Sequence, residues 1–184
     1  MAARVIAPYD PRWPVLFDEL EALLRSAIGD EVISIDHVGS TAVPGLAAKD
    51  VIDIQVTVGS LDCSAAWPNQ IGPFHRRHGV VQDHLPPGEA AGRGWEKRYW
   101  SSRDPAAHLH VREQGRPNQR YALLFRDFLR AEPRAARAYE RAKRQLSSIC
   151  QDKDIYSDAK DPICDLVMCH AETWATQTGW KSGT

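Results

Sequence analysis

Two apolar runs separated by a short turn constrain the fold of this 184-residue chain more than any other feature. Val32–Val38 and Val51–Val58 have the length and the β-branched content that are typical of buried strands. Between them lie Gly-Ser-Thr at 39–41 and Pro-Gly at 44–45, which favour a turn. We therefore expect two strands joined by a short irregular connection.

The Gly39-Ser40-Thr41 turn is a candidate phosphate site. Backbone N–H groups that follow a strand, together with a Ser or Thr hydroxyl, can hold phosphate oxygens, and glycine lets the backbone approach a ligand closely. The same residues also suit an ordinary turn. The sequence has no G-x-x-x-x-G-K-[ST] motif, so it gives no support for a P-loop kinase.

Asp53 is an acid inside the second apolar run. Burial of an unpaired carboxylate is costly, so this acid is expected either to pair with Lys49 or Arg98, or to ligate a divalent metal. Gln55 shares its face, because side chains alternate along a strand. Two neighbouring Mg²⁺ ions need bridging carboxylates, so the neutral Gln55 argues against a two-magnesium centre.

A His-x-His pair offers further ligands. Lys97–Val111 has the pattern of a hairpin around an Asp104-Pro105 turn, which places His108 and His110 on one face of its second strand. Imidazole suits Zn, Mn, Fe or Ni better than Mg, and it can also act as a general base. Such a pair can equally be exposed or hydrogen-bonded. We predict Asp53, His108 and His110 as catalytic residues, with Asp53 and His110 as ligands of one metal ion.

The rest of the chain is largely helical. Trp67–Pro87 is broken by Pro and Gly and carries strand-like pieces only near Phe74 and Val80. Helical periodicity runs from Pro11 to a stop at Gly29, over Asn118–Leu129, over Pro133–Ile149, and from Asp161 or Pro162 to about Gln177. The order of elements predicts one α+β domain over residues 1–184, with a helical cluster from about residue 117.

Several motifs spread over nearly the whole chain resemble the GrpB-like family, a branch of the nucleotidyltransferase superfamily of the DNA polymerase β type. The matching pieces are Tyr9-Asp10-Pro11-x-Trp13-Pro14, His37–Leu46, Lys49-x₃-Asp53, Lys97-Arg98, His108–Val111, Phe125–Arg130, Tyr139-x₃-Lys143 and Tyr156-x₃-Lys160. The resemblance implies a small mixed sheet of nucleotidyltransferase type that is flanked by helices. In this family too, an uncharged residue commonly stands where the superfamily has its second acid, as Gln55 does here. Some members of the family are fused to dephospho-coenzyme A kinase.

The resemblance also implies a ligand and a reaction. It points to ATP or another nucleotide, or a phosphorylated small molecule, with a divalent metal that is Mg, Mn or Zn. The residues predicted to bind phosphate are Gly39, Ser40, Thr41, Lys49, Lys97, Arg98, Arg126, Arg130 and Lys160. We expect a metal-dependent enzyme that transfers a nucleotidyl or phosphoryl group to an unknown acceptor. The alternatives are a non-catalytic module that binds a nucleotide or a coenzyme A-related ligand, and an ATP-dependent ligase that works by adenylylation.

Composition limits the partners. With 23 basic and 24 acidic residues the formal net charge is −1, which gives no reason to expect nucleic acid or an anionic membrane as a partner. The basic run at 134–144, which includes Lys143, is expected to be an exposed charged face of a helix. The four cysteines form no C-x-x-C pair, and neither a signal peptide nor a membrane span is recognised, so the expected location is the cytoplasm. The oligomeric state is not indicated.

Overall fold

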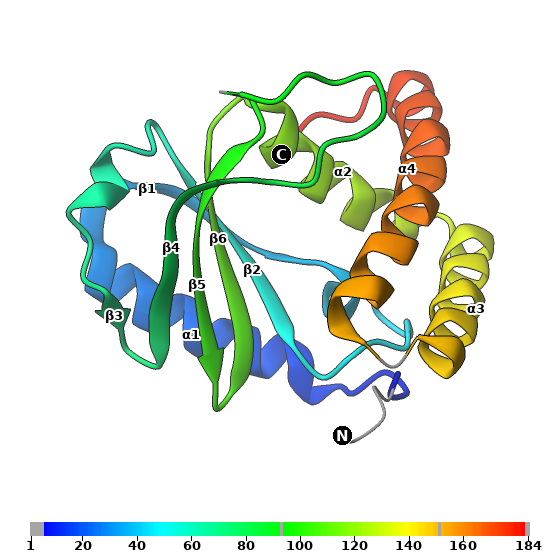
Figure 1. Cartoon of the computed structure of the whole chain (residues 1–184), viewed down its shortest axis with the longest axis horizontal. Coiled ribbons are helices and arrows are strands. Elements are labelled where there is room, and N and C mark those ends of the chain that lie inside the picture. The colour runs from blue at the N-terminus through cyan, green and yellow to red at the C-terminus, as the bar shows by residue number, and fades with distance from the viewer. Residues whose placement is uncertain (1–5, 93, 151, 183–184) are drawn as a thin grey trace.

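The computed structural model describes residues 6–92, 94–150 and 152–182. Helix α1 and then all six strands come first along the chain, and the last third is helical (Figure 1). The helices are α1 (Arg12–Ile28), α2 (Pro117–Ala131), α3 (Pro133–Ile149) and α4 (Lys153–Thr178), with short 3₁₀ turns η1 (Gly29–Glu31), η2 (Ser40–Ala42) and η3 (Cys63–Ala65). The strands are β1 (Val32–Val38), β2 (Ile52–Val58), β3 (Gln70–Ile71), β4 (Phe74–Gln82), β5 (Glu96–Arg103) and β6 (Ala106–Glu113).

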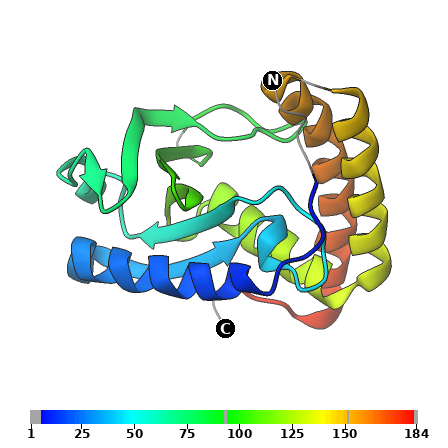
Figure 2. The same cartoon turned by 90° about the horizontal axis from the view of Figure 1, so that it is seen from below.

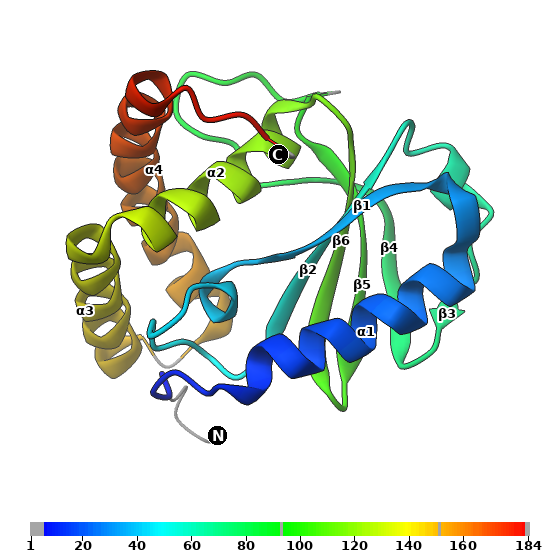
Figure 3. The same cartoon turned by 180° about the vertical axis from the view of Figure 1, so that it is seen from behind.

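The strands form one 6-stranded mixed sheet in the order β1-β2-β6-β5-β4-β3. The β2–β6 pair is parallel, and the other neighbouring pairs are antiparallel. Helix α1 runs along one face of the sheet (Figures 2 and 3), and apolar side chains of α1, β2 and β6 fill the space between them. Trp13 and Trp100 are buried in this core. The α+β class is therefore confirmed.

Helices α2, α3 and α4 pack on one another beside the sheet, with α3 and α4 side by side (Figures 1 and 2). Their shared core includes Leu124, Phe128 and Ala171, and it also takes Val43 and Leu46 from the connection between β1 and β2. The β1–β2 connection is therefore held between the sheet and the helical cluster. This is the connection that carries the predicted phosphate turn.

Two predicted segment boundaries are wrong. Helix α4 begins at Lys153 rather than at Asp161 or Pro162, because Asp152 caps its first turn by accepting the backbone N–H of Ile155 at 3.1 Å. Pro162 lies inside the helix, where sequence rules favour a start. Likewise, β4 is one continuous strand from Phe74 to Gln82 that absorbs Gly79 through register irregularities.

Candidate functional site

The Gly39 turn follows β1 and touches Asp53 on β2. Gly39 has φ 71° and ψ −168°, a conformation that is almost exclusive to glycine. A Cβ atom at this position would lie 2.5 Å from the Asp53 Oδ2 atom. The buried Thr41 fixes the turn from below, because its Oγ1 donates to the Val51 carbonyl at 3.3 Å and lies 2.9 Å from His37 Nε2. The Ser40 hydroxyl remains on the cavity side of the turn.

The parallel pairing of β2 with β6 brings the predicted metal ligands together. Asp53 pairs with His108 and Gln55 pairs with His110 in the register. The Asp53 Oδ1 atom lies 3.0 Å from His108 Nδ1 and 3.7 Å from His110 Nε2. The ligand atoms of these three side chains lie within 4.8 Å of one another. The Asp53 side chain is 33% exposed and the His110 side chain is 16% exposed, so the three side chains open toward the cavity on the Asp53 side.

The donor set fits a single divalent ion. Two ligand atoms that are each about 2.1 Å from a metal lie about 3.0–3.4 Å apart in octahedral or tetrahedral geometry. The Asp53–His108 separation of 3.0 Å lies in this range, and the Asp53–His110 separation of 3.7 Å lies slightly above it. Burial and the nearby Lys97 and Arg112 lower the pKa of His110 to about 3, so its imidazole is neutral and able to ligate. Burial opposes the charge of Asp53, but the two histidines hold its pKa well below the usual range. His110 presents its Nε2 to Asp53, while its buried Nδ1 has no hydrogen-bond partner among the described residues.

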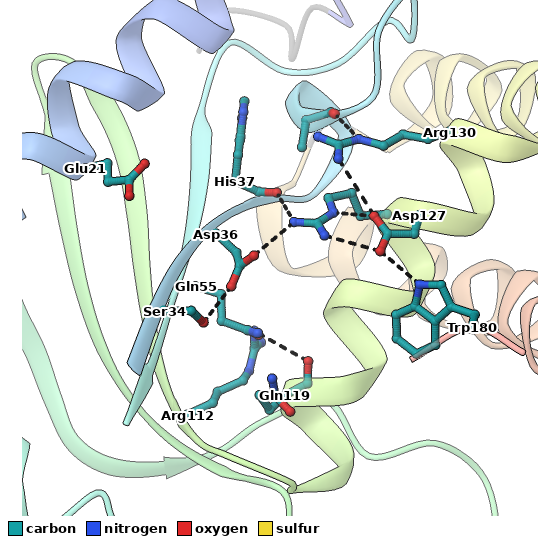
Figure 4. A network of polar contacts seen from close by, with 12 residues as sticks. Glu21, Ser34, Asp36, His37, Gln55, Arg112, Gln119, Asp127, Arg130 and Trp180 are labelled. Atoms are coloured by element: carbon teal, nitrogen blue, oxygen red, sulfur yellow. Dashed lines mark hydrogen bonds and ion pairs between the residues drawn. The ribbon is translucent and has the colours of Figure 1, made fainter. Parts of the chain in front are cut away.

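Gln55 is excluded from this ligand set by its own contacts. Its Nε2 donates to the Gln119 carbonyl at 3.2 Å, and its Oε1 accepts from Arg112 Nη1 at 2.7 Å. Arg112 also donates from Nε to Asp83 Oδ2 at 2.7 Å, and the Oδ1 atom of Asp83 accepts from Lys97 at 2.6 Å. Burial opposes ionisation of Asp83, but Arg112 and Lys97 keep its pKa well below the usual range. Gln55 therefore belongs to a buried polar chain that joins the sheet to α2 (Figure 4).

A cavity with two lobes surrounds the Asp53 group. One lobe has a volume of about 250 Å³ and aromatic walls that include Trp95, Tyr121 and Phe125. The other has a volume of about 510 Å³ and a lysine-rich wall. The residues that line both lobes are Ser40, Asp53, His110, Tyr139 and Lys160. Asp53 and His110 thus lie where an aromatic compartment meets a cationic one.

The lysine wall contains three predicted residues and one that was not predicted. Lys49 lies over the Tyr156 ring at 3.8 Å from its centroid, Lys97 pairs with Asp83, and Lys160 lines both lobes. The fourth is Lys143 of α3, which is 3% exposed and donates to Ser40 Oγ at 2.9 Å. The expectation that Lys143 belongs to an exposed charged face is wrong, because α3 turns this side chain inward against the turn. The Tyr139-x₃-Lys143 spacing was the available signal, since residues four apart share a helix face.

Three of the predicted arginines lie elsewhere. Arg98 points to the opposite face of β5, where its Nε donates to the Leu61 carbonyl at 3.1 Å. Arg126 is held by Asp127 at 2.7 Å, by Asp36 at 3.3 Å and by the His37 carbonyl at 3.1 Å. The Arg130 Nε donates to the Ala42 carbonyl at 2.9 Å.

The Arg126 contacts fasten α2 to β1, and the Arg130 contact fastens it to the β1–β2 connection (Figure 4). In the same network, Trp180 donates to Asp127 at 3.0 Å, so the segment after α4 is fastened to α2 as well. The two arginines line a separate surface pocket beside Phe17 and His37. We therefore leave Arg98, Arg126 and Arg130 out of the candidate site.

A histidine closes the aromatic lobe on the side of α4. His84 follows β4, and its ring nitrogens lie 3.2 Å from Asp161 and 2.8 Å from Asp165. These contacts, led by the hydrogen bond to Asp161, raise the pKa of His84 to about 9. The imidazolium thus links the segment that precedes Trp95 to the helical cluster.

The fold and the site together define an α+β protein with a carboxylate–dihistidine group beside a glycine-serine turn. Comparison with known proteins then gives the family. Residues 4–170 match the family described as GrpB protein, and the chain belongs to this family. The crystal structure of GrpB from Enterococcus faecalis is similar, with a TM-score of 0.71 at 26% identity over 92% of this chain and 99% of the other.

Two sequence relatives differ in length. A protein of Mycolicibacterium paratuberculosis named dephospho-CoA kinase is 36% identical over 96% of this chain but only 48% of its own length. A UPF0157 protein of Halalkalibacterium halodurans, BH1888, is 34% identical over 92% of this chain and 83% of its own length. The chain thus spans about half the length of the dephospho-CoA kinase that it matches. Within the described residues, no helix combines the length and the apolar character that crossing a membrane requires.

Proposed function

We propose that this protein is a metal-dependent enzyme of nucleotidyltransferase type that transfers a nucleotidyl or phosphoryl group. The observation that carries the proposal is the cluster of Asp53, His108 and His110 directly under a glycine-serine turn and facing a lysine-lined cavity. Carboxylate and imidazole donors suit Zn or Mn better than Mg. When bound, a divalent ion would neutralise charge on a transferring phosphoryl group.

The chain's own residues have complementary tasks in this proposal. Ser40 and the neighbouring backbone N–H groups hold a phosphate, because Gly39 allows close approach of the backbone. Lys49 and Lys160 balance the phosphate charge from the cationic lobe. The aromatic lobe offers Trp95 and Tyr121, whose rings lie 6.1 Å apart between centroids, as surfaces for a planar base or acceptor.

The test combines metal binding, nucleotide binding and turnover. Metal content is measured after dialysis against Zn²⁺, Mn²⁺ or Mg²⁺, ATP binding is measured by calorimetry with each metal, and release of pyrophosphate or phosphate reports turnover. The wild type should bind one ion and ATP. Asp53→Asn should lose the ion and the turnover, whereas Asp30→Asn, which changes an exposed acid in η1, should lose neither. A protein that binds neither metal nor ATP would overturn the proposal.

A binding module without turnover is the second candidate. Its specific support is Gln55, which is held by Arg112 and Gln119 at the position where a two-metal enzyme would need a second acid. The name of the longer mycobacterial relative adds a coenzyme A-related molecule as a ligand to test. Binding of ATP or of dephospho-coenzyme A with equal affinity in wild type and Asp53→Asn, and no turnover in either, would favour the module. Release of AMP and pyrophosphate only in the presence of an amine and a carboxylate would instead identify a ligase.

A further inference from the structure

Lys143 is a buried amine whose hydrogen bonds are incomplete. Its Nζ donates to Ser40 Oγ at 2.9 Å and to the Ala47 carbonyl at 2.6 Å. An ammonium group has three donors, and in the described part of the chain the third finds no acceptor. Lys143 lines the lysine-rich lobe, so this donor has a cavity beside it.

The charge of Lys143 also has no ion-pair partner among the residues that the structure describes. The nearest candidate is Glu140, one turn earlier on α3. Its oxygens accept instead from Arg144 Nε at 2.9 Å and from the Ala47 N–H at 3.2 Å. A buried cation without a carboxylate is costly, and it therefore favours an anionic ligand.

A second lysine faces the same space. Lys160 of α4 lines both lobes of the cavity, and it forms neither a hydrogen bond nor an ion pair within residues 6–92, 94–150 and 152–182. Burial and the charge of Lys160 together lower the pKa of Lys143 to about 7. Burial opposes the charge of Lys160, but Cys164, Asp161 and Asp53 raise its pKa above the usual value.

We propose that Lys143 and Lys160, with the Ser40 hydroxyl, form a subsite for a tetrahedral dianion of the phosphate type. The subsite lies beside Gly39, which touches Asp53, so the bound group would be next to the proposed metal ligands. This deepens the proposed function, on which it rests, by naming where the phosphoryl group sits and by adding Lys143 as its direct contact.

Proton uptake follows from this arrangement. A dianion between the two amines favours the protonated form of Lys143, so binding should weaken as the pH rises through about 7. The ionisable groups that surround Lys143 come from its own helix, from α4 and from the β1–β2 connection. They are Tyr139, Glu140, Arg144, Tyr156, Lys160, Cys164 and Lys49.

Sulfate is the probe for this subsite, because it is a tetrahedral dianion that does not titrate near neutral pH. Calorimetric titration of the full chain is done at pH 6 and at pH 8.5, without metal. Wild-type affinity should fall about tenfold or more between the two pH values, since a group with a pKa near 7 loses its proton in this range. Lys143→Met should bind sulfate about 10- to 100-fold more weakly at pH 6 and with no such pH dependence.

Arg141→Met is the matched control, since Arg141 is an exposed cation on the same helix. It should bind sulfate as the wild type does. The stability of Lys143→Met should change little, because replacing a buried charge that has no carboxylate partner by an apolar chain of similar length should offset the loss of its hydrogen bonds to Ser40 and Ala47. Unchanged sulfate affinity in Lys143→Met, or no sulfate binding by the wild type at pH 6, overturns the subsite. Sulfate binding without any metal or ATP binding would instead leave the subsite standing and overturn the proposed function.

Discussion

Replacing Gly39 by alanine should damage both the fold and the metal site, and a second glycine allows the two effects to be separated. Gly39 has φ 71° and ψ −168°, and Gly29 at the end of α1 has φ 78° and ψ −149°. Alanine at either position should cost about 1–3 kcal/mol in backbone strain. A Cβ atom at Gly29 meets no atom within 4 Å, whereas one at Gly39 meets Asp53 Oδ2 at 2.5 Å and Asp53 Cβ at 3.0 Å.

The contact with Asp53 adds a second contribution at Gly39 alone. Forcing an extra methyl group into a packed position costs about 1–3 kcal/mol. Gly39→Ala should therefore be destabilised by about 2–6 kcal/mol, and by about 1–3 kcal/mol more than Gly29→Ala. In a chain of this size the difference corresponds to roughly 2–12 °C in Tm.

Urea and thermal denaturation of the two variants measure this difference. Metal affinity is measured on folded protein, and Gly39→Ala should bind Zn²⁺ or Mn²⁺ at least about tenfold more weakly, because the Asp53 carboxylate must move away from the histidines. Gly29→Ala should bind metal as the wild type does. Equal destabilisation of the two variants would refute the argument that Gly39 is required by its contact with Asp53.

Three further results are expected. His84 has a pKa raised to about 9, so the stability that it contributes is fully present below about pH 6.5 and is lost as the pH rises through about 9. In urea titrations, the difference in stability between wild type and His84→Gln should therefore shrink over this range. Arg126→Met should lose about 2–4 kcal/mol in denaturation experiments, because the half-buried Asp36 and Asp127 carboxylates both lose their ion pair with Arg126. The variant should still bind sulfate normally, and weakened sulfate binding in the folded variant would return Arg126 to the site. His110→Ala should lose most metal affinity in the dialysis assay, and retention of a full equivalent of metal would exclude His110 as a ligand.

The sequence is sufficient for the features that depend on local periodicity. Alternation along β2 puts Asp53 and Gln55 on one face, and alternation along β6 puts His108 and His110 on one face, as the structure has them. The helical spacing of α2 likewise places Arg126 and Arg130 one turn apart. Periodicity does not predict which element packs against each face of a strand or helix, because that depends on the tertiary arrangement.

The features that were not predicted all depend on such packing. Lys143 belongs to a basic run whose other members include the exposed Arg137 and Arg141, and only the docking of α3 against the β1–β2 connection makes it a buried residue. Asp83 directly follows β4, whose sequence is broken by glycine, and it becomes part of the site only through contacts with Lys97 of β5 and Arg112 of β6. The two arginines of α2 are on one face as predicted, but that face is directed to the outer side of β1.

The alternation along β2 has a consequence for how this site can change. Ile52, Ile54 and Val56 fill the core from one side of the strand, while on the other side Asp53 lines the cavity and Gln55 binds the buried Arg112. The residues that fix the register are therefore not the residues that carry the chemistry. If the proposed function holds, substitutions at 53, 55, 108 and 110 should change metal binding or turnover while the packed face keeps the strands aligned.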